Sequence, residues 1–135
     1  MNNYILFALL AMMSIICATA TDYRAAEYAA ERVLSDLDPN IYDIDISISM
    51  NSVIIEFTTL SRGLDILTDV SDAIGVYIII LKDNPNVGDL KILATQSNGK
   101  SAGIYTCQNS WAKGIDTDDE FQKLFLKVVQ TIQQG

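Results

Sequence analysis

The clearest pattern in the chain is the strict alternation of apolar and polar residues between positions 43 and 49. Ile44, Ile46 and Ile48 alternate with acidic and serine side chains. Because successive side chains of a β-strand point to opposite faces, this pattern predicts a strand with one apolar face and one face in water. A second strand-like run, residues 53–58, follows after a short Asn-Ser turn. The two runs are therefore predicted to pair as a hairpin.

A second hairpin is predicted around Asn98-Gly99. This dipeptide separates residues 90–96 from residues 101–107, and both runs resemble strands. An Asn-Gly pair in this position is typical of a type I′ turn, in which both central residues adopt positive φ. We therefore expect positive φ at Asn98 and at Gly99.

Two helices are predicted before and between the hairpins. Residues 22–37 are rich in alanine and carry apolar side chains at helical spacing. Residues 60–81 form the longest helical pattern in the chain. Leu60 and Leu64 belong to its apolar stripe, and three aspartates are placed on its opposite, polar face. These aspartates are Asp65, Asp69 and Asp72.

A third helix is predicted near the end of the chain. Thr117 and Glu120 have the spacing of a capping box, in which each side chain satisfies a backbone N–H of the first helical turn. An apolar stripe follows and is expected to pack on the sheet. It comprises Phe121, Leu124, Phe125, Val128, Val129 and Ile132.

This order of elements, α-β-β-α-β-β-α, predicts an α+β fold. Two hairpins joined through a helix most simply form one four-stranded antiparallel sheet. The water-facing side of the first hairpin indicates that the helices cover only one face, which gives a two-layer sandwich. No linker divides the sequence, so residues 21–135 are predicted to form a single domain.

The domain is preceded by an apolar segment, residues 4–18, which ends at Ala18-Thr19-Ala20. This length and this ending are typical of a secretory signal peptide covering residues 1–20. The sequence therefore predicts an extracytoplasmic protein, secreted or in the cell envelope. The alternative is a single-pass membrane protein anchored by residues 4–20, since the run is almost long enough to span a bilayer.

Composition excludes several classes of function. The chain has 17 acidic and 9 basic residues and a net charge of −8. An acidic domain is repelled by phosphate, so we expect no nucleic-acid partner, and membrane contact only through an uncleaved N-terminal segment. The chain contains no histidine, which excludes Ser-His-Asp and Cys-His catalysis and histidine-containing zinc sites within it. No sequence motif indicates a cofactor or a metal, and we predict neither.

Cys107 is a weak candidate for a binding or reactive site, with Tyr105 and Trp111 near it in sequence. A thiol between aromatic side chains could react with a ligand. However, no histidine is present to activate it, and a buried apolar cysteine is the favoured interpretation. Trp111 could anchor a ligand, although a lone tryptophan more often fills a core.

Asp43 and Asp45 are the other candidates, because both are predicted to lie on the water-facing side of the first strand, with Glu56 opposite. Paired carboxylates can act as acid and base, but on an open sheet face solvation is the better explanation. A further acidic cluster, residues 116–120, lacks the spacing of a calcium loop and is explained by helix capping.

The sequence as a whole favours a small exported binding module without catalytic activity. The partner would be an unknown protein or small molecule, bound on the sheet face that carries Asp43 and Asp45 or on residues 108–115. Two alternatives remain open at this stage. One is a membrane-anchored accessory subunit, and the other is an enzyme that uses Cys107 without histidine.

Overall fold

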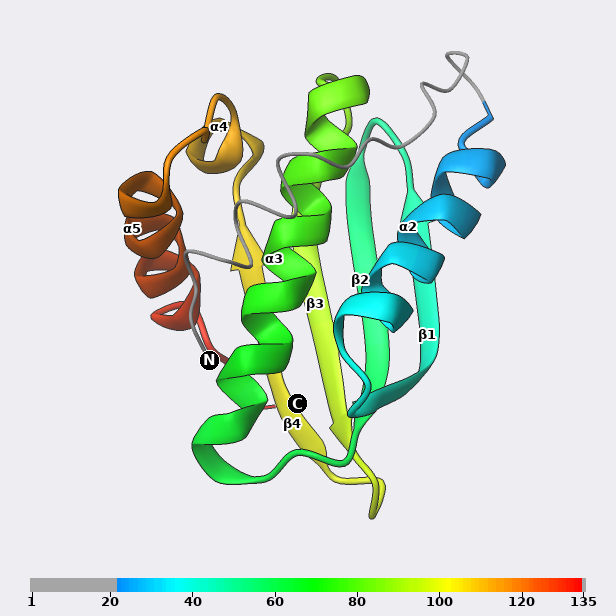
Figure 1. Ribbon diagram of the computed structural model, residues 1–135, viewed down its shortest axis with the longest axis vertical. Coiled ribbons are helices and arrows are strands. Elements are labelled where there is room, and N and C mark those ends of the chain that lie inside the picture. The colour runs from blue at the N-terminus through cyan, green and yellow to red at the C-terminus, as the bar shows by residue number, and fades with distance from the viewer. Residues whose placement is uncertain (1–21, 135) are drawn as a thin grey trace.

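The computed structural model describes residues 22–134 and has one four-stranded sheet with helices on one face. The predicted order of helices and strands is confirmed (Figure 1). The predicted signal peptide or anchor, residues 1–20, lies outside the described residues.

The sheet has the strand order β1-β2-β3-β4, with β1 at Ile41–Ile48, β2 at Ser52–Thr59, β3 at Asp89–Gln96 and β4 at Ser101–Cys107. Both predicted hairpins, β1–β2 and β3–β4, are antiparallel. The central pairing, β2–β3, is parallel, so the sheet is mixed and the prediction of an antiparallel sheet is wrong for this pair. The reason is that the helix between the hairpins carries the chain back along the length of the sheet, so that β3 starts beside the beginning of β2.

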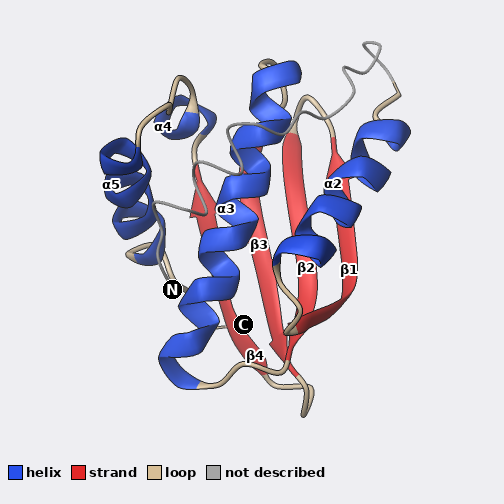
Figure 2. Ribbon diagram, viewed as in Figure 1, coloured by secondary structure: helices blue, strands red, loops and turns tan. Residues whose placement is uncertain are grey.

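Three main helices cover the sheet: α2 at Arg24–Leu37, α3 at Ile66–Asp83 and α5 at Asp118–Val129. Figure 2 shows them side by side in front of the strands, with α3 in the middle. Two short helices complete the fold, η1 at Gly63–Asp65 and α4 at Asn109–Ala112.

The long helix starts later than predicted. Its first regular turn begins at Ile66, after the short helix η1. Leu60 and Leu64, which were predicted in its apolar stripe, are 59% and 83% exposed. The positive φ of Gly63, 59°, interrupts the helical pattern between these leucines and the rest of the stripe.

The second turn also differs from the prediction. Gly99 has φ 88°, but Asn98 does not have positive φ, so the turn is not of type I′. Gln96 N–H donates to Lys100 O (2.7 Å), and Gly99 N–H donates to Gln96 O (2.9 Å). These bonds define a three-residue loop with glycine in the left-handed position, another common hairpin connection.

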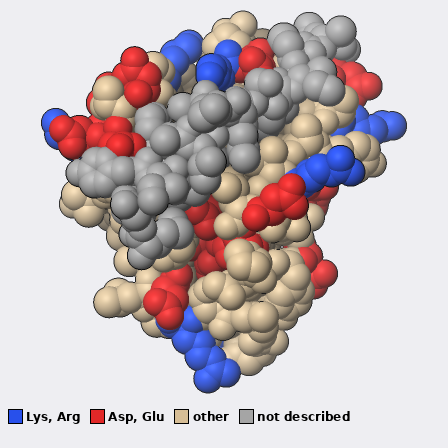
Figure 3. Space-filling model, viewed as in Figure 1, with Lys and Arg blue, Asp and Glu red and all other residues tan. Residues whose placement is uncertain are grey.

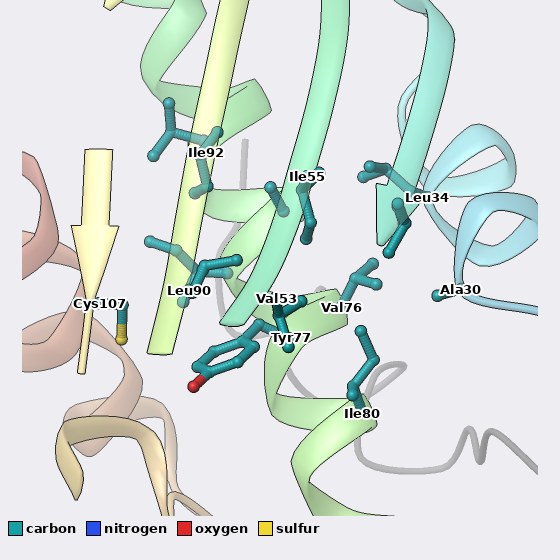
Figure 4. Packing of buried hydrophobic residues seen from close by; sticks show 14 of the residues in the cluster. Ala30, Leu34, Val53, Ile55, Val76, Tyr77, Ile80, Leu90, Ile92 and Cys107 are labelled. Carbon is teal, nitrogen blue, oxygen red and sulfur yellow. The ribbon is translucent and has the colours of Figure 1, made fainter. Parts of the chain in front are cut away.

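The core lies between the sheet and the three main helices (Figure 4). Its centre is formed by α3, whose residues Val76, Tyr77 and Ile80 face side chains of the two central strands and of α2. Tyr77 Oη donates to Gly88 O (2.8 Å), which satisfies the one polar atom of this side chain. The largest fully buried side chains are Tyr77, Tyr105, Phe121, Leu34, Ile46, Ile55, Ile74, Ile79, Ile80, Leu90 and Ile92.

Helix α2 also caps the outer edge of the sheet. Glu31 Oε2 accepts a hydrogen bond from the backbone N–H of Ile46 (2.9 Å), and Glu27 Oε2 accepts one from Ile48 (2.8 Å). Strand β1 is the first strand of the sheet and has only β2 beside it. The two glutamates therefore occupy backbone donors that another strand could otherwise use.

Candidate functional site

A shallow groove of about 720 Å³ runs between α2 and β1. Its two tyrosines are unusually accessible for aromatic side chains: Tyr28 is 66% exposed and Tyr42 is 40% exposed. Tyr28 comes from α2 and Tyr42 from β1, so both elements contribute an aromatic ring. The complete lining is Tyr28, Glu31, Arg32, Ser35, Ile41, Tyr42, Asp43 and Ile44. We call these residues the α2–β1 groove.

Asp43, one of the candidates from the sequence, lies in the α2–β1 groove at a β-bulge. The register of β1 against β2 shifts between Tyr42 and Asp45, and Asp43 has φ 52°. It is the only non-glycine residue with positive φ between residues 22 and 134. Such a backbone conformation costs on the order of 1–3 kcal/mol and concentrates at functional sites. The bulge leaves Tyr42 and Asp43 exposed together beside α2.

Asp45, the second acidic candidate, is exposed and lies directly opposite Glu56 of β2. Like charges in this position repel each other, so the pair does not stabilise the sheet. The bulge separates it from Asp43, and the two aspartates do not form one site. Glu56 is in turn the partner of Leu93 in β3, which places a half-buried apolar side chain in the middle of the open sheet face.

Tyr105 and Cys107 lie inside the protein, 1% and 0% exposed. Tyr105 Oη donates to Ala102 O (3.3 Å), and Cys107 Sγ lies 3.5 Å from Gln108 O. Burial raises the pKa of the Cys107 thiol to about 12, and the nearby Asp89 side chain makes a smaller contribution in the same direction. The thiolate that nucleophilic chemistry requires is therefore scarce at neutral pH.

Trp111 is half-buried on the short helix α4, and Lys127 Nζ lies 4.6 Å from the centroid of its ring. This contact is a cation–π interaction and links α4 to α5. Tyr105, Cys107 and Trp111 therefore do not form one accessible pocket. Residues 112–115 of the predicted surface 108–115 instead line a different cavity, between α3 and the chain that follows α4.

A cluster of three buried carboxyl groups was not predicted. Asp38 follows α2, Asp69 and Asp72 belong to α3, and all three are at most 3% exposed. Thr59 Oγ1 donates to Asp69 Oδ2 (2.6 Å), and Asn40 N–H donates to Asp38 Oδ1 (3.0 Å). One further oxygen of each carboxyl group has no hydrogen-bond partner. We call Asp38, Asp69 and Asp72 the aspartate cluster.

Asp69 and Asp72 of the aspartate cluster keep their protons to a higher pH than exposed aspartates do. Burial raises the pKa of Asp69 to about 7 and that of Asp72 to about 8, and the neighbouring Asp38 carboxyl contributes to both shifts. A protonated carboxyl carries no charge, so protonation of Asp69 or Asp72 removes repulsion within the cluster. The sequence prediction that Asp69 and Asp72 lie on the polar face of their helix is wrong, because that side of α3 faces the end of α2.

These carboxyl groups are buried and are not arranged to hold a metal ion. Among the described residues, no three His, Cys, Asp or Glu side chains are arranged to hold a metal ion. None of the three aspartates lines the α2–β1 groove or three further cavities between residues 22 and 134. Because the aspartate cluster is buried, the accessible candidate site is the α2–β1 groove.

Of the two exposed tyrosines, only Tyr28 could have been found from the sequence. Tyr28 falls outside the apolar stripe predicted for residues 22–37, so an exposed ring was already implied. The bulge that brings Tyr42 and Asp43 beside it leaves no signal in the alternating pattern of β1.

Comparison with protein-family models, curated proteins and solved structures found no match to this chain. Between residues 22 and 134, no helix combines the length and the apolar character needed to cross a membrane. The interpretation of the site therefore rests on its geometry and its chemistry.

Proposed function

We propose that this protein is a small exported binding module without catalytic activity, and that a partner protein docks on the α2–β1 groove. The observation that carries the proposal is the pair of exposed tyrosines, Tyr28 and Tyr42, on either side of a groove that also holds Arg32. Tyrosine and arginine are the residue types most enriched among the side chains that dominate binding energy at protein interfaces.

The backbone at Asp43 supports the same surface. A bulge with positive φ is retained only where the surrounding structure holds it in place, and here it presents Tyr42 and Asp43 to solvent together. The glutamates that cap β1 support docking through side chains, because they leave Ile46 and Ile48 N–H unable to pair with an added strand.

The acidic surface gives the partner a preferred charge. Figure 3 shows acidic side chains spread over the face that carries the helices, and the whole chain has a net charge of −8. A basic partner would associate faster than a neutral one and would do so more slowly at high salt.

A photo-crosslinking amino acid placed at Tyr28 or Tyr42 tests the docking surface in the cells that make the protein. We expect both positions to capture the same partner. Leu126 is the matched control, because it is 59% exposed and lies on α5, at the opposite side of the helical layer (Figure 1). Equal capture from Leu126 would contradict the proposal.

Binding of the captured partner then gives a quantitative check. Tyr28→Ala and Tyr42→Ala should each weaken binding about tenfold or more, the effect of losing a residue worth more than ~1.4 kcal/mol. Leu126→Ala should leave the affinity unchanged. If neither tyrosine variant weakens binding, the groove is not the docking surface.

Export is supported by the apolar run that ends at Ala18-Thr19-Ala20. Mass spectrometry of the native protein should give an N-terminus at or near Thr21. An intact Met1 in the membrane fraction would favour the membrane-anchored accessory subunit instead, and an intact Met1 in the cytosol would contradict export.

A further inference from the structure

The tip of the β3–β4 hairpin carries the one Asn-Gly pair in the chain, Asn98-Gly99. Both residues are exposed, and neither lines the α2–β1 groove. An asparagine that precedes a glycine can react with its own backbone, because the glycine nitrogen can reach the carbon of the side-chain amide. The geometry of the turn decides whether these two atoms meet.

The nucleophile of such a reaction is the backbone nitrogen of Gly99. Apart from the adjoining residues, no heavy atom lies within 4 Å of the place where a side chain would begin at this position. Gly99 has φ 88°, and glycine changes between positive and negative φ at little cost. The surroundings of Gly99 therefore leave room for its nitrogen to rotate into an attacking position.

The electrophile is the side-chain carbonyl of Asn98. Lys100 N–H donates to Asn98 Oδ1 (3.0 Å), which directs this carbonyl toward the residues that follow it, where Gly99 N lies. When Gly99 N attacks Asn98 Cγ, negative charge develops on Oδ1, and a donor already in place at that oxygen stabilises the charge. The turn therefore orients and activates the carbonyl.

One hydrogen bond of the turn opposes the reaction. Gly99 N–H donates to Gln96 O (2.9 Å), and this bond must open before the nitrogen can attack. Because the bond lies at an exposed loop tip, its local opening costs much less free energy than unfolding of the domain. The bond therefore slows the reaction of Asn98 without preventing it.

We propose that Asn98 is a site of spontaneous deamidation, with Gly99 N as the nucleophile and water as the second reactant. A bond forms between Gly99 N and Asn98 Cγ while the bond from Cγ to Nδ2 breaks, and Nδ2 leaves as ammonia with the proton of Gly99 N. Water then opens the cyclic imide at either of its carbonyls, which gives aspartate or isoaspartate at position 98. The proposal does not depend on the partner protein inferred above.

The two products differ in their effect on the hairpin. Either one replaces an uncharged amide by a carboxylate, so the modified chain is more negative than the original chain, whose net charge is −8. Isoaspartate in addition routes the backbone through the former side chain and lengthens it by one carbon. The bonds of Gln96 with Gly99 and Lys100 then cannot both keep their geometry, so this product should loosen the turn.

Incubation of the purified protein at neutral pH, followed by peptide mass spectrometry that separates aspartate from isoaspartate, tests the proposal. Asn98 should give both products and should convert at least tenfold faster than Asn51, which is also exposed but precedes a serine. Asn51 is the matched control, because Ser52 N–H is held by Ser49 Oγ (3.1 Å) at the start of β2. Aspartate without isoaspartate would mean direct hydrolysis, and equal rates at the two asparagines would mean that Gly99 has no special role; either result overturns the proposal.

Two variants identify the attacking atom. Gly99→Ala places a methyl group beside the nitrogen and should slow the conversion of Asn98 at least tenfold, whereas Lys100→Ala keeps its backbone N–H and should not change the rate. The same comparison in guanidinium chloride removes any effect of Gly99→Ala on the folding of the turn, and the alanine variant should still react more slowly. If Gly99→Ala reacts as fast as the wild type in the unfolded chain, Gly99 N is not the nucleophile and the assignment is refuted.

Discussion

The aspartate cluster should make the protein less stable as the pH rises, the reverse of the usual behaviour of buried carboxylates that form ion pairs. The pKa of Asp72 is raised from 3.8 to about 8 and that of Asp69 from 3.8 to about 7. Between pH 3.8 and the raised pKa of each group, the folded chain keeps protons that the unfolded chain has released. Folding therefore takes up protons, and the free energy of unfolding falls as pH increases from about 4 to about 8.

The size of the effect follows from the shifts. Each pKa unit corresponds to about 1.4 kcal/mol. Between pH 5 and pH 9, the Asp72 shift alone is worth roughly 4 kcal/mol and the Asp69 shift roughly 3 kcal/mol by this conversion. The two groups are neighbours, and water can enter as they ionise, so the contributions do not add fully. We expect a total loss of about 3–5 kcal/mol.

Asp72→Asn isolates this contribution. The amide has the shape of a protonated carboxyl and is likewise uncharged, so the variant should lie within about 1 kcal/mol of the wild type at pH 5. At pH 9, where wild-type Asp72 is ionised, the variant should be more stable by roughly 2–3 kcal/mol. Asp45→Asn, on the open sheet face, is the control, and its free energy of unfolding should fall with pH as steeply as that of the wild type.

Urea unfolding at several pH values, followed by the fluorescence of Trp111, the one tryptophan in the chain, measures these differences. The reasoning fails if the wild-type free energy of unfolding is constant or rises from pH 5 to pH 9. It also fails if Asp72→Asn loses stability as steeply as the wild type does.

Three further predictions concern the core, the thiol and the sheet edge. Phe121 on α5 is 1% exposed, so Phe121→Ala should lower the free energy of unfolding by about 3–5 kcal/mol. The exposed Gln130→Ala should change it by less than about 0.5 kcal/mol in the same urea experiment, and equal effects would mean that α5 is not docked. Because burial raises the pKa of Cys107 to about 12, a thiol reagent should label it at neutral pH only as fast as the protein unfolds. Rapid labelling of the folded protein would instead restore the hypothesis of a reactive cysteine. Glu31→Ala removes the acceptor for the N–H of Ile46 and should lower the free energy of unfolding by about 1–2 kcal/mol. Glu31→Gln keeps an acceptor oxygen and should restore most of the loss in urea unfolding; equal losses in both variants would contradict the capping role.

Local sequence patterns predicted the strands and hairpins well, because strands and hairpins form between residues that are close in sequence. The alternation of Ile44, Ile46 and Ile48 placed β1, although the bulge leaves Ile44 less buried than the other two. The β2–β3 pairing depends on how α3 crosses the sheet. The sequences of the two hairpins do not indicate the direction of that crossing. Two antiparallel hairpins were therefore predicted, while the parallel contact between them was not.

The candidate site was predicted only in part. Asp43 was expected to be exposed, but its position in a groove with Tyr28 depends on the packing of α2 beside β1. Asp69 and Asp72 were assigned to solvent because charged residues on one side of an amphipathic helix usually face water. A central helix has neighbours on several sides, and here one of them is Asp38, which is distant in sequence.

The hydrogen bonds from Glu27 and Glu31 of α2 to β1 protect the edge of the sheet from pairing with other molecules. The solubility of the protein therefore depends on α2 remaining packed against β1. If α2 swings away, Ile46 and Ile48 N–H lose their acceptors and β1 becomes an open edge that can recruit a strand from another molecule. The aspartate cluster lies at the C-terminal end of the same helix, and ionisation of Asp69 and Asp72 adds negative charge on α3 beside Asp38. Alkaline conditions or proteolytic removal of α2 should therefore produce aggregates rich in β-structure while β2, β3 and β4 are still folded.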